Sequence, residues 1–323
     1  MSRAIRGRSA RLPSLAVSGL GIWGAIALLA MLALLFEPRF FQLNNLQEIL
    51  RRASILGIVT MGQVLVLLTA GIDLSVGALI GVTAMIIAET TAPGGSGLAV
   101  GFLMMLVVGL GVGLTNGLLI TVRRTPPFVA TFGMFVVLEG ARLAYTGGTV
   151  SGTVPAVLRS AGRGTLLGLP WATLCLVITV VALTVFVNRR PRGRQLVMTG
   201  ANERMARLSG IQVGRLKVLA YVACSSLAVV AGVFFAGFVG YIDRFIGRGM
   251  DLDSVAAALL GGTTFSGGEG SFVRAAAGAL LIVALLNLIV VAGLSVEWQF
   301  VVKGVVLIGA VALQMLTRRD PGR

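Results

Sequence analysis

Carboxylates that interrupt long apolar runs are the residues of this sequence most able to carry chemistry. Only a few of the 12 acidic residues do so, and Asp73 is the clearest case. An ionised carboxylate among apolar groups has to face protein partners or water, because its desolvation is costly. Gly71 and Gly77 flank Asp73 and indicate a broken helix, in which Asp73 and Ser75 would cap the helix that follows. Asp73 is therefore either a helix cap or a direct participant in gating or in a substrate path.

Other polar side chains within apolar runs allow two interpretations. Amides and hydroxyls in such positions either bridge neighbouring helices or hydrogen-bond a hydroxyl-rich substrate. Pro126 and Pro127 mark the start of a further helix, because proline is tolerated in a first helical turn. Phe128 and Thr131 are then expected to face one side of that helix and to help line a path. The candidate path residues are Gln63, Asp73, Ser75, Asn116, Phe128, Thr131 and Asn287.

The residue types exclude several kinds of chemistry. The chain has no histidine, which excludes histidine general bases, histidine metal sites and histidine proton relays. Cys175 and Cys224 lie far apart in apolar runs, which indicates two small buried side chains rather than a disulfide framework. Glu139 and Arg142 are three residues apart and are expected to form a structural ion pair on one helix face. Neither a metal nor a cofactor is expected.

The composition indicates a helical integral membrane protein. Of the 323 residues, 56% are hydrophobic and 12% are charged, and the mean hydropathy is +0.95. Soluble domains carry about 25% charged residues, so a water-facing surface cannot be built here. Apolar runs of about 18 residues or more recur along the chain, whereas a membrane β-barrel has shorter alternating strands. The expected fold class is all-α and polytopic.

About ten apolar segments are expected, within a single transmembrane domain over 15–317 between short tails at 1–14 and 318–323. The first is longer than the apolar core of a signal peptide, which has about 7–15 residues, so we expect a retained helix. Segment 254–265 is too short to cross about 30 Å of hydrocarbon as one straight helix, which suggests a half-helix or a re-entrant piece. The segments fall at about 15–36, 53–70, 74–91, 97–122, 127–145, 165–187, 214–240, 254–265, 273–294 and 299–316.

The basic residues predict the orientation of the chain. With the N-terminus inside and ten alternating crossings, 18 of the 27 basic residues fall inside, 8 fall outside, and Lys303 lies in a span. This positive-inside bias predicts that both termini are cytoplasmic in an inner (plasma) membrane. The net charge of +15 is explained by topology. A nucleic-acid partner is not expected, because there are no basic patches interleaved with aromatics and no soluble domain to carry them.

The longest inside segment, 188–213, contains a short helix. Asn202 can cap it, Glu203 suits its first turn, and Gly210 is typical of its end. The arginines at 189–194 are expected to be only a positively charged flank. The helix either covers the loop or docks a cytoplasmic partner. Its apolar residues at helical spacing are Met205, Leu208 and Ile211.

The stretch from Gly200 to Ile211 resembles the coupling motif of permease subunits in ribose-type carbohydrate ABC importers, a family of binding-protein-dependent sugar permeases. Met205 departs from the pattern, since related sequences more often have a small residue there. The resemblance extends from about residue 60 to residue 304, and the first 50 residues add little to it. Four further strings follow the family's order: Gly71–Gly77 after Gly62-Gln63, Thr125–Met134, Gly261–Ser271 and Trp298–Gly304.

The resemblance implies import of a monosaccharide or related small polyol into the cytoplasm. The chain has no G-x-x-x-x-G-K-[ST] string, so it is not expected to be an enzyme, and ATP hydrolysis belongs to a separate cytoplasmic ATP-binding subunit. The resemblance further implies an extracytoplasmic sugar-binding protein and a dimer with a second permease copy or a paralogue, embedded in lipid. The expected ATPase-coupling residues are Gly200, Asn202, Glu203, Met205, Ala206, Leu208, Ser209, Gly210 and Ile211.

Two other classes of function compete with this one. An ion-coupled secondary transporter would use Asp73, but it needs carboxylates at the bilayer midplane and often an inverted repeat. Only Asp73 and the paired Glu139 are available, and no repeat is obvious. An intramembrane enzyme is not favoured, because the sequence lacks histidine, paired carboxylates and a serine–lysine dyad at helical spacing.

Two loops complete the predictions. Loop 241–253 is either a docking surface for the binding protein or an ordinary solvated loop. Loop 261–271 is expected to form a tight inside-facing turn.

Overall fold

The computed structural model describes residues 20–91, 97–147, 152–242, 245–295 and 297–317, and all of its long elements are helices. The two expected tails therefore lie outside the described residues, as does the start of the first apolar segment. Thirteen α-helices, one short 3-10 helix and four two-residue strands make up the described chain. The all-α polytopic fold class predicted from composition is confirmed.

Within the described residues, six helices are long and apolar enough to cross a membrane. A helix rises about 1.5 Å per residue, so about 20 residues span the hydrocarbon. These helices are α2 (Leu43–Leu68), α4 (Leu98–Thr121), α5 (Pro127–Thr146), α7 (Trp171–Arg189), α10 (Val213–Val239) and α12 (Phe272–Val291).

The remaining apolar segments also form helices, so each of the ten predicted segments corresponds to one helix. These are α1 (Leu20–Phe36), α3 (Val76–Thr90), α11 (Met250–Leu260) and α13 (Glu297–Thr317). Helix α11 has 11 residues, about 16 Å at 1.5 Å per residue, which is roughly half of the hydrocarbon thickness. This length agrees with the half-helix or re-entrant piece predicted for the segment, and whether it crosses the membrane stays a prediction.

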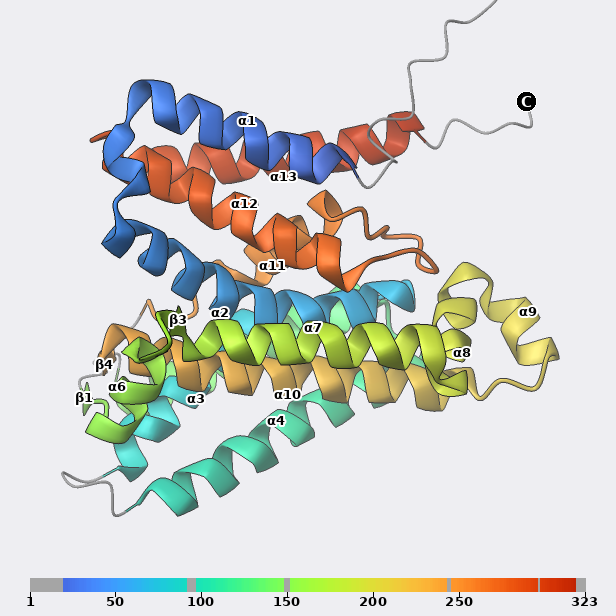
Figure 1. The fold of residues 1–323 in the computed structure, drawn as a ribbon. Coiled ribbons are helices and arrows are strands. Elements are labelled where there is room, and N and C mark those ends of the chain that lie inside the picture. Colours follow the sequence, from blue (N-terminus) through green and yellow to red (C-terminus); the bar gives the residue numbers. More distant parts are fainter. Residues whose placement is uncertain (1–19, 92–96, 148–151, 243–244, 296, 318–323) are drawn as a thin grey trace, which may run out of the picture.

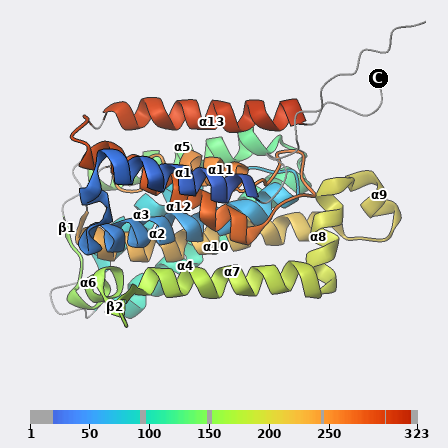
Figure 2. The same cartoon turned by 45° about the horizontal axis from the view of Figure 1, so that its top comes forward.

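Short elements cap the two ends of the bundle. On one side lie η2 (Pro38–Phe41), α6 (Ala156–Arg163) and two antiparallel strand pairs, β1 (Gly152–Thr153) with β4 (Tyr241–Ile242) and β2 (Thr165–Leu166) with β3 (Leu169–Pro170). At the opposite end, α8 (Pro191–Ala201) and α9 (Glu203–Leu208) project beyond the long helices (Figure 1). Figure 2 shows the same separation of the two ends from another direction.

Helix α10 lies at the centre of the packing and contacts α2, α3 and α4 closely. Small residues make this approach possible, as is usual for helices that associate in lipid. A Cβ added at Gly113 of α4 would lie 2.6 Å from the Cα of Val222, and one at Gly62 of α2 would lie 2.8 Å from the Cα of Cys224. Helix–helix distances around α10 are therefore set by backbone contact.

The buried part of the bundle is uneven. Helix α2 is buried along most of its apolar length, whereas α4, α5 and α7 expose large Leu, Val, Ile and Phe side chains on their outer faces. Exposed apolar area on this scale is incompatible with water and is typical of a surface that faces lipid or a partner chain. This agrees with the composition argument for an integral membrane protein.

The arginine-rich stretch at 189–194 was expected only as a charged flank, and that prediction was incomplete. It forms the start of α8, with Pro191 in the first turn, where its fixed φ is favourable. Gly193 lies against the backbone of Phe186 and Val187 in α7, and an added Cβ would collide there. The glycine that lowers helix propensity is the residue that lets α8 fold back on α7.

We predict that Gly113→Ala destabilises the bundle and that Gly111→Ala does not. Both glycines lie on α4, but a Cβ at position 111 meets nothing within 4 Å, whereas one at 113 meets the α10 backbone. Overpacking of this kind costs roughly 1–3 kcal/mol. The apparent melting temperature in detergent, followed by size-exclusion chromatography after heating, is expected to fall by several degrees for Gly113→Ala alone. Equal melting temperatures for the two variants would contradict the packing account.

Candidate functional site

The break between α2 and α3 brings most of the predicted path residues together. After Leu68 the chain turns sharply, with Ala70 at a φ of +57°, and the N–H of Gly71 donates to the carbonyl of Val66. Residues 71–75 then run back beside the last turns of α2. The amide of Gln63, oriented to satisfy both groups, bonds the backbone carbonyl and N–H of Asp73 at 3.1 and 3.2 Å. The broken helix predicted from the flanking glycines is confirmed.

Asp73 is fully buried at this break and organises its start. One carboxylate oxygen, Oδ1, accepts from the Ser75 N–H at 2.9 Å and from the Ser75 hydroxyl at 2.6 Å. Such a side-chain bond to the N–H two residues on is the usual turn made by aspartate before a helix. The hydroxyl of Ser75 makes no bond to the α3 backbone and instead accepts from the Asn116 amide at 3.0 Å. Ser75 therefore occupies the N-cap position but makes no side-chain cap bond, and Asp73 bonds the N–H of this N-cap residue without capping α3 itself; the Ser75 hydroxyl instead joins α3 to α4.

Two more helices hold the same break through one carbonyl. The hydroxyls of Thr131 in α5 and Tyr221 in α10 both lie 3.3 Å from the carbonyl oxygen of Ile72 and are placed to donate to it, and the Thr131 hydroxyl also lies 2.9 Å from the Pro127 carbonyl oxygen of its own helix. Both side chains are fully buried. Tyr221 was missed from the sequence, where the available signal was a tyrosine inside an apolar run, since a buried tyrosine hydroxyl usually has a partner. Side chains from α2, α4, α5 and α10 therefore converge on residues 72–75.

Two predicted path residues lie elsewhere. Phe128 has 56% of its surface exposed and stacks on Phe132 at 5.7 Å, whereas Thr131 is buried. The expectation that Phe128 and Thr131 face one side of α5 is wrong, because Thr131 is buried against Ile72 in the break whereas Phe128 turns outward. Asn287 of α12 exchanges amide hydrogen bonds with Asn45 of α2 at 3.0 and 2.9 Å. Asn287 thus bridges two helices in this structure.

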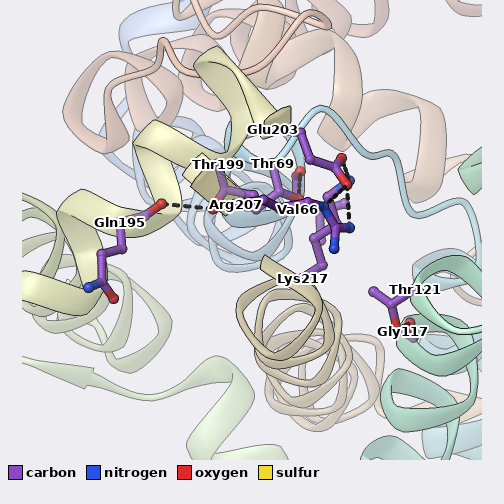
Figure 3. Close-up of polar contacts among 9 residues, drawn as sticks. All are labelled: Val66, Thr69, Gly117, Thr121, Gln195, Thr199, Glu203, Arg207 and Lys217. Atoms are coloured by element: carbon purple, nitrogen blue, oxygen red, sulfur yellow. Dashed lines mark hydrogen bonds and ion pairs between the residues drawn. The ribbon is translucent and has the colours of Figure 1, made fainter. Parts of the chain in front are cut away.

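The predicted inside helix forms as α9, with the expected ends. The Asn202 side chain accepts from the Met205 N–H at 3.0 Å, and Gly210 has a φ of +79° just after the helix. Glu203 bonds Arg207 on its own helix and Lys217 on α10, each at 2.6 Å (Figure 3). The hydrogen bond from Lys217, with a further contribution from Arg207, holds the pKa of the Glu203 carboxyl below its usual value. This ion pair fixes α9 against the start of α10.

The apolar side of α9 is mostly exposed. Met205 and Leu208 are 56% and 74% exposed, while Ala206 is buried and Ile211 is half-buried. A short, anchored helix that presents two large apolar side chains outside the bundle has the form of a docking surface.

Gly200 connects this corner to the α2–α3 break. A Cβ on Gly200 would collide with the carbonyl oxygen of Leu68 and would lie 2.6 Å from the N of Gly268. The same Leu68 carbonyl accepts from the Gly268 N–H at 3.1 Å. Gly267 and Gly268 have positive φ values in the turn between α11 and α12, so the prediction of a tight glycine turn at 261–271 is confirmed. The end of α2, the end of α8 and the turn between α11 and α12 thus meet with their backbones in contact, just before Asp73 in the chain.

The loop at 241–253 is only partly a surface feature. It starts as β4 and ends in α11, and residues 243–244 lie outside the described residues. Ile246 and Gly247 are buried, and an added Cβ on Gly77 of α3 would lie 3.0 Å from the carbonyl oxygen of Gly247. Asp251 follows at the start of α11 and lies close to Gly77.

The Glu139–Arg142 ion pair predicted on α5 is confirmed at 2.6 Å.

We predict that loss of the Glu203 charge loosens α9. Because the folded-state pKa is lowered from the ordinary 4.5, the ion pair is present at neutral pH and is lost only as pH falls through that lowered value. An exposed pair contributes about 0.2–1 kcal/mol, so the effect is local. Glu203→Gln at pH 7 should speed amide hydrogen exchange in 203–209 severalfold, and Arg204→Gln should not. Unchanged exchange in Glu203→Gln would contradict the anchoring role.

Comparison with known proteins places this arrangement in one family. The family model described as branched-chain amino acid transport system / permease component matches residues 45–311. The ribose import permease protein of Bacillus subtilis is 35% identical over 301 residues, covering 91% of this chain and 92% of the relative. The corresponding Escherichia coli K12 protein is 34% identical, covering 88% and 91%.

A third relative carries a different substrate name. The autoinducer 2 import system permease protein of Yersinia enterocolitica is 32% identical over 286 residues, covering 88% of this chain and 79% of the relative. No solved structure matches the chain significantly. The family match and the full-length relatives agree with the resemblance found in the sequence motifs. The chain belongs to the family of transport-system permease components that includes the ribose import permeases.

Proposed function

We propose that this chain is the membrane permease of an ATP-driven importer that moves a monosaccharide or related small polyol into the cytoplasm. The observation that carries the proposal is the α9 corner, an exposed docking helix anchored to α10 and joined through Gly200 to the α2–α3 break. The names of the relatives, ribose and autoinducer 2 import permeases, support small hydroxyl-bearing substrates. They give no support to ion-coupled transport through Asp73.

A separate ATP-binding subunit docks on α9 in this proposal. Met205 and Leu208 supply the apolar contact, and the neighbouring Arg204, Arg207 and Arg215 are exposed, which favours an acidic rim on the partner. ATP hydrolysis is therefore assigned to the partner, and this chain has no covalent step to perform.

Movement of α9 would reach the membrane interior through packed contacts. Helix α9 follows α8 with only Asn202 between them, and Gly200 at the end of α8 lies against Leu68 and Gly268. Residues 69–75 follow Leu68 directly, and Ile72 among them packs against Val255 and Leu259 of α11. The bonds from Gln63, Asn116, Thr131 and Tyr221 make the break a rigid unit. A displacement of α8 is thus passed to α11 without a flexible link.

Each of the other proposed partners is assigned to one end or to the sides of the bundle. Helix α1 begins and α13 ends on the side where α9 lies (Figure 1), which supports placing both termini in the cytoplasm with the docking corner. The opposite end, with the β1–β4 pair and α6, is then available to an extracytoplasmic sugar-binding protein. Lipid and a second permease copy or paralogue cover the exposed apolar faces of α4, α5 and α7.

The first test is recovery of the ATP-binding subunit. Native membranes are solubilised in mild detergent, the tagged chain is purified, and co-purifying proteins are identified. We expect an ATPase with the native chain and with Leu208→Met, and at least a tenfold loss with Leu208→Glu, because a charge at this exposed position opposes apolar docking. An ATPase that remains bound to Leu208→Glu would contradict docking on α9, and none with the folded native chain would overturn the importer proposal.

The second test separates docking from transmission. Uptake of D-ribose, D-xylose, D-galactose and D-glucose is measured in cells that carry the complete import system, with a proton ionophore to remove ion coupling. We expect ionophore-resistant uptake of at least one sugar, and at least a tenfold loss in Gly200→Ala with the ATPase still bound. Gly214→Ala, where an added Cβ meets only Thr121 at 3.9 Å, is the matched control. Normal uptake in Gly200→Ala would exclude the Gly200 contact as the transmission point.

A further inference from the structure

A large cavity lies on a part of the molecule that the Asp73 cluster does not include. Its volume is about 760 Å³, and its walls come from α11, α12 and α13, from residues 245–249 just before α11, and from one side chain of α5. The residues involved belong to the first half of α13 and the second half of α12, so the cavity lies toward the end of the bundle opposite α9. Ligand sites commonly have volumes of about 300–1,000 Å³, are mostly apolar, and contain a few placed polar groups.

The polar groups of the cavity balance in charge. Lys303 of α13 bonds Asp253 of α11 at 2.6 Å, and Arg248, Asp251 and Gln299 also line the space. Two cationic and two anionic side chains leave no net charge for a charged solute to neutralise. Their carboxylates accept hydrogen bonds, and the ammonium, guanidinium and amide groups donate them. This set matches a neutral solute that carries both donors and acceptors at many positions.

The apolar groups of the cavity complete the same pattern. The rings of Phe135, Phe245 and Phe300 contribute to its wall from three different segments. A sugar ring has hydroxyls around its edge and C–H groups on its faces, so it can use the charged groups and the aromatic rings together. A lipid chain would leave the charged groups without a use.

The cavity wall is attached to the α2–α3 break. Val255 and Leu259 of α11 pack against Ile72, and Leu307, which lines the cavity, belongs to the same cluster. The Oδ1 of Asp251 would lie 3.2 Å from a Cβ on Gly77 at the start of α3. Movement of the break therefore moves one wall of the cavity.

We propose that this cavity holds the monosaccharide during its passage, with Asp251, Asp253, Lys303 and Gln299 bonding its hydroxyls, while the Asp73 cluster moves the wall. This inference rests on the proposed function. It assigns sugar contact to α11 and α13, and it gives Gln63, Asp73, Ser75, Asn116 and Thr131 a positioning role.

The test is protection of an introduced thiol in cells that carry the complete import system. Gln299→Cys is labelled with a charged, membrane-impermeant methanethiosulfonate, with the native chain as the background for Cys175 and Cys224. The sugar of the uptake panel that is imported fastest, at saturating concentration, should slow labelling of Gln299→Cys at least threefold. Glu297→Cys, at the exposed polar start of the same helix and not on the cavity wall, should react with the reagent and be unaffected by sugar. Leu252→Cys, on the cavity wall, replaces Gln299→Cys if that variant is not found in the membrane.

The outcomes separate this inference from the importer proposal. Protection at 299 or 252 with none at 297 supports the cavity as the sugar site. Normal uptake without protection overturns the inference and leaves the importer proposal intact. A cavity thiol that never reacts, with or without sugar, shows that lipid or a second permease copy fills the space, and this result also overturns it. Absence of uptake of every panel sugar by the native chain counts against the proposed function itself.

Discussion

The burial of one carboxylate is the constraint on which the interior of this protein depends. An unpaired charge at such a position is costly, so Asp73 can be fully buried only if polar groups are brought to it. Ser75 supplies two hydrogen bonds directly, and Gln63 fixes the Asp73 backbone. Because Gln63 belongs to α2, Ser75 directly precedes α3, and the Ser75 hydroxyl accepts from Asn116 of α4, these bonds also set how α2, α3 and α4 meet, although Oδ2 of Asp73 has no hydrogen-bond partner among the described residues. The apolar contacts around them hold the helices together, while this polar contact decides their register.

Glycine has a second, complementary role in the same region. Polar side chains define where the break lies, and glycines at 200, 267 and 268 allow two further segments to reach it at backbone distance. A larger side chain at position 200 would separate α8 from α2. A surface helix and a buried break thus form one packed structure, although about 130 residues separate them along the chain. Such an arrangement suits a protein whose task is to transmit a displacement.

Local patterns were predictable from the sequence, whereas long-range convergence was not. The Asn202 cap, the Glu139–Arg142 pair, the helix start at Pro127 and the break around Asp73 each depend on residues within a few positions of one another, and all are present. The fold class followed from composition. The meeting of Gln63, Asn116, Thr131 and Tyr221 depends on tertiary packing, which no spacing rule contains. Phe128 was misplaced for the same reason, since the packing of α5 against α3 and α4 sets which face of the helix turns inward.

The short length of α11 has a consequence for how a solute can be kept from leaking. Helix α11 is about 16 Å long, roughly half the thickness of the surrounding hydrocarbon. In the proposed pathway beside α11, the seal would lie in one or two helical turns around the buried Val255 and Leu259, instead of being spread over a full span. A thin seal can be opened by a small displacement, but it also tolerates few packing defects. Tight closure at rest and fast opening under load are therefore demanded of the same few side chains, and substitutions there should trade one property against the other.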